Sequence, residues 1–432
     1  MRTLKRFIST AIVAGALSLG GCTEWLAVDN PTVIDNDVLD PVADAPLLAK
    51  AAQQNFASAY GHLIVYSSWF VGETDVSETF PTRNEFGRRD ITIQNGSLDT
   101  DVWFPLSQSV ASAYLVLDAA LPDTTTNINY ARVNLFLGYS YVFMAEQFCQ
   151  GTVRAGPPLA TIDMLDSAVA HFTLATAQFV AAGGNDTVGA DTALSALAHA
   201  GRVGVARAQL QAGRLPEAIA AANSVRAGFN YNLNYKDDLA QRFRVANRMW
   251  FYVRDRGSIA VAPIWRIGPQ LPVGQVQNAD PRVPWLIQTV FAPQDAAYSS
   301  DRGFPYAIQQ KYPDYGLPVR LASKLEADYI TAEAQGTAAQ LTLIGARRTA
   351  NGQAAYGGAT DSNSVLTEFF TQRGLDFYLE GKRLGDFQRH PANIIGLPVP
   401  GSTYWKPGFA PVGNNTCYPL PITETENNPN FP

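Results

Sequence analysis

The stretch AGRVGVARAQLQAGRLPEAI (residues 200–219) predicts two short helices joined by a tight turn. Small residues recur in it at helical spacing, and they allow two helix backbones to approach closely: Ala200, Gly201, Gly204 and Ala208. Gly213 then supplies a turn geometry that a β-carbon would resist. This pattern is typical of a tetratricopeptide-type helical hairpin, and it indicates helical packing without indicating a ligand.

Helical periodicity continues on both sides of this hairpin. Apolar residues recur every three to four positions from Pro46 to Leu63, and Pro46 stands where the first helical turn tolerates proline. The same spacing predicts further helices over 104–121, 127–149, 161–182, 192–212, 214–226, 320–340 and 365–389. We therefore expect an N-terminal helical part over 44–227, and C-terminal helices with an extended proline-rich tail over 319–432.

Residues 228–318 have a different composition. They hold nine prolines and fifteen aromatic residues, and helical periodicity is absent except for a strand-like pattern over Ser258–Ile267. A long irregular stretch inside a compact chain is usually functional or disordered, and this many rings argues against disorder. We expect an ordered, irregular cap that lies on the helices.

The first 21 residues predict a lipoprotein signal peptide. Arg2, Lys5 and Arg6 precede an apolar run that ends in Gly20-Gly21-Cys22, and this run is shorter than the ~20 residues of a membrane span. Cys22 is therefore the predicted lipidation site, and residues 22–43 form a polar tether. The alternative is an ordinary signal peptide whose cysteine stands there by chance.

Charge and cysteine usage limit the partners. Without residues 1–21 the chain has 29 basic and 38 acidic residues, a formal charge of −9, which argues against nucleic acid as a partner. Cys149 and Cys417 remain after Cys22; in an exported protein they suggest a disulfide, with two unrelated buried thiols as the alternative. The chain has no Cys/His cluster, so we expect no metal site and no cofactor.

Several segments together resemble the SusD/RagB family of nutrient-binding outer-membrane lipoproteins. They follow the family's order along the chain: Trp25–Pro31, Leu317–Ala322, Tyr329–Ala334, Gln372–Phe387, Tyr418–Ile422 and Asn427–Asn430. Gln372, Leu384 and Ser323 depart from the family's usual residues, which affects the identity of the ligand more than the fold. The resemblance implies a mainly α-helical fold of four tetratricopeptide-like hairpins packed against the irregular cap.

The resemblance also implies a function. Members of this family are lipid-anchored on the outer face of the bacterial outer membrane and bind glycans or other nutrients without catalysis. They deliver the ligand to a SusC-like TonB-dependent transporter, which would be the protein partner here. Two other functions stay open from the residues alone: a scaffold lipoprotein of envelope assembly, and a lipid-anchored hydrolase that cleaves glycans.

Neutral sugars are bound by aromatic rings that stack on their apolar faces and by side chains that bond to their hydroxyls. In the cap, the candidate ligand-binding rings are Trp265, Trp285, Tyr298 and Tyr306; in the charged loop 72–90, the candidate polar residues are Glu73, Asp75, Arg83 and Asn84. The alternative for each ring is that it packs the cap onto the helices. For Asp75 and Arg83 the alternative is an ion pair with each other.

Acidic residues of the C-terminal helices have a structural interpretation. Glu380, Arg383 and Asp386 are spaced for ion pairs within one helix, and Glu326 and Glu333 lie two turns apart. A glycosidase needs two carboxylates ~5–10 Å apart across the sugar, and no pair in the sequence points to that arrangement. Nucleophile and phosphate-binding motifs are absent from the sequence, so a binding protein is favoured over an enzyme.

Overall fold

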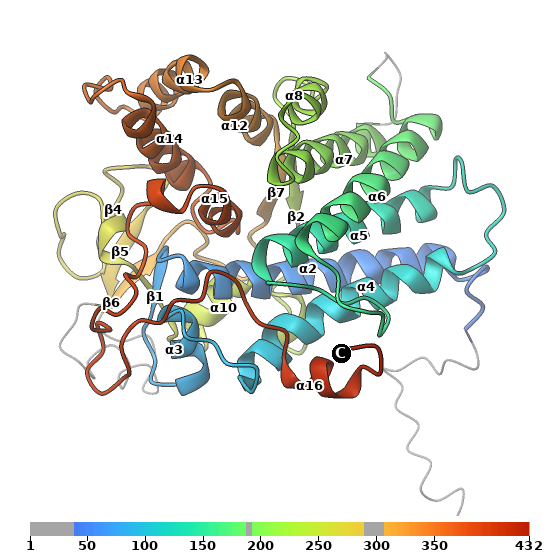
Figure 1. Cartoon of the computed structure of the whole chain (residues 1–432), viewed down its shortest axis with the longest axis horizontal. Coiled ribbons are helices and arrows are strands. Elements are labelled where there is room, and N and C mark those ends of the chain that lie inside the picture. Colours follow the sequence, from blue (N-terminus) through green and yellow to red (C-terminus); the bar gives the residue numbers. More distant parts are fainter. Residues whose placement is uncertain (1–38, 187–191, 289–305, 432) are drawn as a thin grey trace, which may run out of the picture.

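The computed structural model describes residues 39–186, 192–288 and 306–431. Cys22 and Tyr298 lie outside the described residues. The described chain is mainly helical, and short strands occur chiefly in the predicted cap (Figure 1). The mainly α-helical fold class predicted from the sequence is confirmed.

Helix α2 (Ala45–Phe70) is the central element of the fold. Pro46 lies in its first turn, and every residue from Ala59 to Phe70 is buried. A helix that is buried on all sides belongs to the interior of a large domain. Figure 1 shows it running across the middle of the molecule, where α4 (Phe104–Leu117) and α5 (Ile128–Gln147) pack against it.

The next helices pack in sequence order, α5 on α6 (Thr161–Ala181), α6 on α7 (Thr192–Gln211) and α7 on α8 (Leu215–Asn223). Their close approach depends on glycines that face Phe172 of α6. A β-carbon at Gly204 would lie 2.5 Å from the Phe172 ring, and one at Gly138 would lie 2.8 Å from it. The small-residue seam of the predicted hairpin therefore holds one buried ring between three helices.

The C-terminal segment differs from its prediction. The helix expected over 320–340 is instead the strand β7 (Val319–Ser323), followed by α12 (Lys324–Gln335) and α13 (Thr337–Ala350). Ser323 begins α12 because its hydroxyl accepts the backbone N–H of Glu326, and Gly336 separates the two helices with a φ of 87°. The helix expected over 365–389 is likewise divided into α14 (Ser362–Asp376) and α15 (Arg383–Arg389).

The predicted cap contains short strands and short helices. β1 (Thr74–Val76) pairs antiparallel with β3 (Ile259–Val261), β2 (Asn230–Leu233) pairs with β7 through a bulge, and β4 (Val276–Gln277), β5 (Trp285–Gln288) and β6 (Tyr306–Gln309) form an antiparallel sheet. Only the first part of the strand predicted over 258–267 forms. Among the described residues of the cap, the helices are α9 (Arg242–Val245) and α10 (Arg248–Arg254), with a 3₁₀ turn at Pro263–Trp265.

Charged residues near α15 pair mainly between elements, which corrects the prediction of pairs within one helix for Glu380 and Arg383, whereas Asp386 forms one pair inside α15, with Arg389. Glu380 precedes α15 and bonds to Lys311 and Arg320 at 2.7 and 2.8 Å. Asp386 bonds to Arg373 at 2.9 Å and to Arg389 at 2.8 Å. Arg383 packs its guanidinium 4.8 Å from the Trp265 ring. The acids of α12 also pair across elements, Glu326 with Lys382 at 2.8 Å and Glu333 with Arg389 at 2.7 Å.

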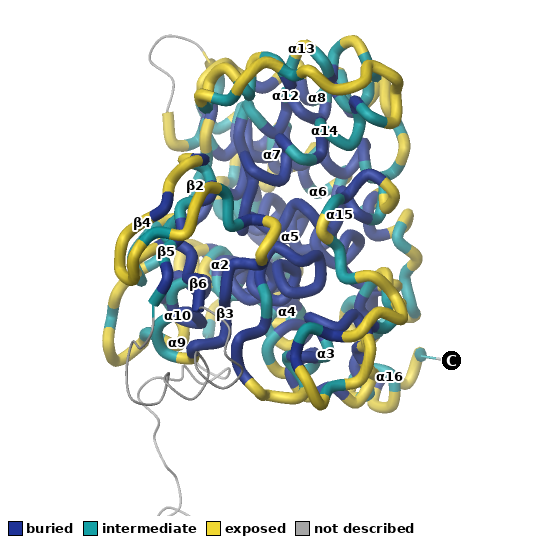
Figure 2. The backbone as a smooth tube through the Cα atoms, turned by 90° about the vertical axis from the view of Figure 1, so that its left-hand side faces the viewer, coloured by how far each residue is buried: buried dark blue, intermediate teal, exposed yellow. Residues whose placement is uncertain are grey.

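The tail after α15 returns across the molecule and is fastened to α5. Cys149, just beyond α5, forms a disulfide with Cys417, so the pairing that the sequence left open is present. Phe148 and Tyr418 form a bridge beside it, and the chain ends in α16 (Ile422–Asn427). The buried backbone follows α2, α5 and α7, whereas α13 lies at the exposed surface (Figure 2). None of the helices in the described ranges has the length and apolar character to cross a membrane.

The packing of Gly204 predicts opposite effects of alanine at two helical glycines. Gly204→Ala forces a β-carbon into the Phe172 ring, so we expect the free energy of unfolding to fall by about 1–3 kcal/mol. Gly345 of α13 has no atom within 4 Å of the added carbon, so Gly345→Ala should raise that free energy by up to about 1 kcal/mol. Denaturant titration of both variants measures the difference; equal effects would contradict the packing described.

Candidate ligand-binding site

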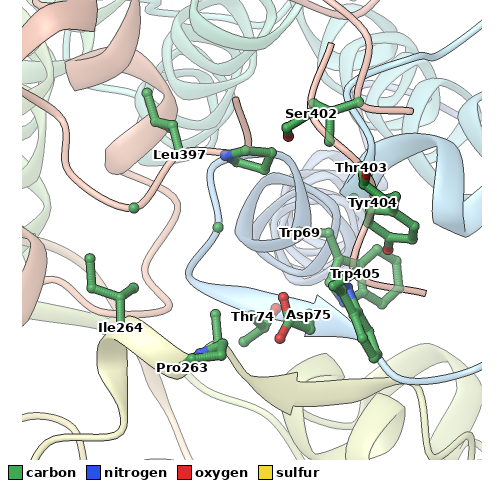
Figure 3. A pocket seen from close by; sticks show the side chains of 16 residues that line it. Trp69, Thr74, Asp75, Pro263, Ile264, Leu397, Ser402, Thr403, Tyr404 and Trp405 are labelled. Carbon is green, nitrogen blue, oxygen red and sulfur yellow. The ribbon is translucent and has the colours of Figure 1, made fainter. Parts of the chain in front are cut away.

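A cavity of about 300 Å³ opens where the end of α2, strand β1, the 3₁₀ turn and the tail meet. Its lining side chains come from segments far apart in the sequence (Figure 3): Trp69, Thr74, Asp75, Pro263, Ile264, Leu397, Pro398, Ser402, Thr403, Tyr404, Trp405 and Val412. Asp75 and Trp405 lie next to each other, and Ile264 and Leu397 face them across the opening. The lining thus combines a carboxylate, rings, hydroxyls and an apolar wall.

Glycines allow three of these segments to cross at short distance. A β-carbon at Gly72 would lie 2.4 Å from the carbonyl oxygen of Gly396, and one at Gly396 would lie 2.7 Å from Ile264. Both glycines have a positive φ, 65° and 71°, which other residues rarely adopt. The loop after α2, the 3₁₀ turn and the tail therefore form the wall of the cavity because glycine stands at each crossing.

The aromatic wall belongs to a loop of the tail that is closed on itself. The backbone N–H of Gly401 donates to the carbonyl of Val412, and that of Val412 donates to the carbonyl of Ser402. Within this loop Tyr404 is buried and Trp405 is partly exposed. Their ring centroids lie 5.9 Å apart. The loop thus presents the Trp405 ring at the cavity with Tyr404 behind it.

Asn84 holds this loop in place from the protein side. Its amide nitrogen donates to the carbonyls of Glu78 and Phe80 at 2.9 and 2.8 Å. Its amide oxygen accepts bonds from the Tyr404 hydroxyl at 3.2 Å and from the Lys406 ammonium at 3.0 Å. Asn84 is fully buried, so it acts as a positioning residue for the aromatic loop.

Asp75 supplies the carboxylate of the cavity. Within the described parts of the chain no side chain forms a hydrogen bond or ion pair with it. Burial raises its pKa to about 6, and the charges of Arg266 and Lys406 oppose that rise. An acceptor of this kind, without a protein partner, is available to ligand hydroxyls.

Trp69 forms part of the floor and has a free donor. The side chain is 1% exposed, and its indole N–H has no hydrogen-bond partner among the described residues. Tyr66 and Tyr252 contact the ring edge-on at centroid distances of 4.9 and 5.8 Å and fix its orientation. A buried unpaired donor is costly, which a ligand acceptor in the cavity would relieve.

Four of the residues predicted to bind ligand have packing roles instead. Trp265 is 2% exposed and donates its indole N–H to the carbonyl of Gly72 at 2.8 Å. Trp285 donates to the carbonyl of Ile267 at 3.2 Å, and Tyr306 is 4% exposed. Glu73 is also buried, accepts the backbone N–H of Leu379, and has its pKa raised by burial to about 7. The structure thus buries these four side chains in packing or backbone contacts, which is the alternative that the sequence left open for the rings.

The other predicted residues have mixed outcomes. Asp75 lines the cavity, and Asn84 lies one contact behind it. Arg83 bonds to Glu78 at 2.7 Å and lies outside the lining of this cavity, so the alternative pair with Asp75 is wrong. Tyr298, outside the described residues, stays a prediction.

Sequence analysis missed Trp69, Tyr404 and Trp405. Trp69 lies on the helical stripe of α2, where a ring is ordinarily part of the core. Tyr404 and Trp405 stand in a proline- and glycine-rich stretch between Gly401 and Gly408, the same composition that singled out the cap. The combination of aromatic residues with proline and glycine therefore marks a loop of the tail as well as the cap, whereas the sequence prediction describes the tail only as extended chain.

The pKa of Asp75 predicts a pH-dependent effect of Asp75→Asn. Because the folded pKa is raised from 3.8 to about 6, the ionised carboxylate destabilises the fold, and this loss develops as the pH rises from about 4 to above 6. We expect Asp75→Asn to unfold at a higher temperature than the unaltered chain at pH 7.5, with the difference vanishing near pH 4. Thermal melts across this range test it.

Asp123→Asn is the control of opposite sign. The hydroxyls of Thr125 and Thr126 lower the pKa of Asp123, so this substitution should destabilise the fold at neutral pH. A melting-temperature difference for Asp75→Asn that stays constant from pH 4 to pH 8 would contradict the assignment of a buried, unpaired carboxylate.

The chain was compared with protein families, curated proteins and solved structures, and only the solved structures match it. No family model matches the chain, and no curated protein matches it at a significant level. Among solved structures, a SusD superfamily protein from Parabacteroides distasonis matches with a TM-score of 0.64 and 14% identity, covering 91% of this chain and 98% of that one.

Two further structures have comparable similarity. A SusD-like carbohydrate binding protein from Bacteroides vulgatus matches with a TM-score of 0.60 and 15% identity over 82% of this chain and 84% of that one. Surface glycan-binding protein A from Bacteroides fluxus matches with a TM-score of 0.60 and 12% identity over 89% and 96%. The chain therefore has the fold of the SusD superfamily, as its sequence motifs predict.

Proposed function

We propose that this protein binds glycans at the bacterial cell surface, with the cavity of Asp75 and Trp405 as its binding site. The observation that carries the proposal is the partly exposed Trp405 ring beside a carboxylate without a protein partner. A ring stacks on the apolar face of a sugar, and a carboxylate accepts bonds from its hydroxyls. Proteins of the same fold described as carbohydrate binding and surface glycan-binding support this choice.

The dimensions of the cavity favour a short part of a longer glycan. Its volume of about 300 Å³ is at the lower end of the range for small-molecule sites, about 300–1,000 Å³. The rim residues Ser402 and Thr403 are exposed, so the rest of a chain can extend into solvent. We infer that one or two sugar units enter the cavity and that Ser402, Thr403 and the Trp69 N–H contribute polar contacts.

The arrangement supports binding without catalysis. Hydrolysis of a glycosidic bond uses two carboxylates on either side of the sugar. In the described part of the chain the lining supplies a single carboxylate, that of Asp75. A second acid nearby, Glu73, is buried and bonded to the backbone of Leu379. We therefore favour a binding protein over a hydrolase.

We further propose that lipid on Cys22 anchors the protein to the outer membrane and that it delivers its ligand to a SusC-like TonB-dependent transporter. These statements depend on the signal sequence and on the motifs shared with SusD/RagB proteins. The tether that would follow the lipid reaches the folded part at the start of α2. A gene for such a transporter beside the gene for this chain would support the delivery role.

Trp405→Ala is expected to weaken glycan binding. A screen on a glycan array first identifies a neutral oligosaccharide that binds, and isothermal titration then measures its affinity. Loss of a stacked ring should raise the Kd by about tenfold. Phe80→Ala is the matched control, because Phe80 is 51% exposed and lies outside the lining. Equal affinity of the Trp405→Ala variant and the unaltered chain would contradict the site.

Cys22→Ala is expected to abolish lipid attachment. In cells that export the chain, radiolabelled palmitate should appear on the unaltered protein and be absent from the variant, which should then be released from the membrane fraction. Each buried CH₂ of the lipid contributes ~0.8 kcal/mol to anchoring, so the two forms should separate completely. Palmitate on the variant, or its absence from the unaltered protein, would contradict the anchor.

A further inference from the structure

A second cavity, of about 660 Å³, lies on another part of the surface. Its lining comes from α2, from the π-helical turn Leu98–Trp103 with Asp99 and Asp101, from Phe104 at the start of α4, and from the cap helices α9 (Phe243, Arg244) and α10 (Arg248). Figure 2 shows α9 and α10 beside α2. It shares no lining residue with the cavity of Asp75 and Trp405.

Arg248 is the unusual residue of this second cavity. It is 2% exposed, yet its Nε and one Nη have no hydrogen-bond partner in the described parts of the chain, and no carboxylate lies within ion-pair distance of it. Its stem crosses α2 so closely that a β-carbon at Gly61 would lie 2.6 Å from its Cγ. The rings of Phe243 and Phe251 lie 4.6 and 5.1 Å from the guanidinium carbon. The side chain is thus held firmly while its Nε and one Nη stay without a hydrogen-bond partner among the described residues.

The two acids of the lining form no ion pair with Arg248 within the described residues, although the charge of Asp101 acts on its guanidinium. Asp101 accepts the hydroxyls of Tyr66 and Tyr252, and Arg83 lies 3.8 Å from it. Asp99 accepts the hydroxyl of Thr423. The nearby acids are therefore engaged by other groups.

Two further basic groups complete the lining. His62 is held neutral because burial lowers its pKa to about 3. Arg244 is exposed at the rim and forms no ion pair with a described residue. The lining consequently holds two guanidinium groups, one deep and one at the mouth, together with the acids Asp99 and Asp101, which bond to other groups.

The mouth of the cavity is apolar. Phe104 is 61% exposed and Phe243 is 56% exposed, and both line the opening. Large exposed rings around a charged interior are typical of a site that binds a ligand with an apolar body and one charged group. A guanidinium binds a carboxylate through two parallel N–H···O bonds.

We propose that this cavity binds a carboxylate ligand, with Arg248 as the deep anion-binding group, Arg244 as a second contact, and Phe104 and Phe243 against the body of the ligand. The volume admits a group of the size of a uronic acid disaccharide or an acylated amino acid. Both present a carboxylate on a body with apolar faces, which is the chemistry the lining recognises.

The unfolding temperature of an Arg248 variant distinguishes a ligand-binding role of this residue from a role in stabilising the fold. A buried charge without a partner destabilises a fold, and an apolar side chain of similar shape is often neutral or stabilising in its place. If Arg248 serves the ligand, Arg248→Met should unfold at the same or a higher temperature and lose the ligand. If Arg248 serves the fold, the variant should unfold at a lower temperature.

The binding experiment uses the full-length chain in a Tris chloride buffer and isothermal titration. The probes are digalacturonate, its fully methyl-esterified form as the uncharged match, and N-acetylphenylalanine as the non-sugar carboxylate. We expect at least one acid to bind, the ester to bind at least about tenfold more weakly, and Arg248→Met to weaken acid binding by about 10- to 100-fold. Tighter binding of digalacturonate would indicate that the natural ligand is a sugar acid, and tighter binding of N-acetylphenylalanine would indicate an acylated amino acid.

Two further variants keep the test decisive if Arg248→Met does not fold. Arg244→Met and Phe243→Ala alter exposed side chains of the mouth, and each should weaken acid binding by about three- to tenfold. Trp405→Ala separates this inference from the proposed glycan site, because it should leave acid binding unchanged. The inference is overturned if neither acid binds, if acid and ester bind equally, if Arg248→Met binds the acid as tightly as the unaltered chain, or if Trp405→Ala abolishes acid binding.

Discussion

The buried ion pair of Glu146 and Arg207 lies at the centre of a network that connects the N-terminal helices to the C-terminal ones. Arg207 of α7 donates to both oxygens of Glu146 of α5 at 2.7 and 2.5 Å, and both residues are almost fully buried. Arg207 also lies 3.6 Å from Glu326 of α12, which pairs with Lys382 just before α15. Buried charges are tolerated when they are paired in this way, and removing one partner leaves an uncompensated charge in the core. Segments far apart in the sequence are therefore joined at one electrostatic centre.

This centre also determines how closely the elements pack. A β-carbon at Gly385 of α15 would lie 2.8 Å from the carboxylate carbon of Glu146, so α15 can approach α5 only with glycine at that position. Burial lowers the pKa of Lys382 to about 8, and its neighbour Glu326 opposes this shift. The C-terminal helices are thus held against α5 and α7, and the tail that follows them is led back across the end of α2, where it builds the wall of the first cavity.

The two cavities differ in the charge that their lining leaves unpaired. The first presents the Asp75 carboxylate beside the Trp405 ring, which suits neutral hydroxyl-rich ligands. The second presents Arg248 behind exposed phenylalanines, which suits an anion. Tyr66 and Tyr252 form the boundary between them, since both contact the Trp69 ring on one side and donate to Asp101 on the other.

The mainly helical fold and the glycine seam of α7 could be predicted from the sequence, because periodicity and small residues are local properties that survive in any packing of the chain. The partners of the ionic residues could not, since Glu380, Asp386 and Glu326 find their charges on distant elements that only the folded chain brings together. For the same reason the cap rings Trp265 and Trp285 proved to be core, whereas Trp405 of the tail reached the cavity. Which ring is exposed depends on which surface another segment covers, and that is decided by the tertiary structure alone.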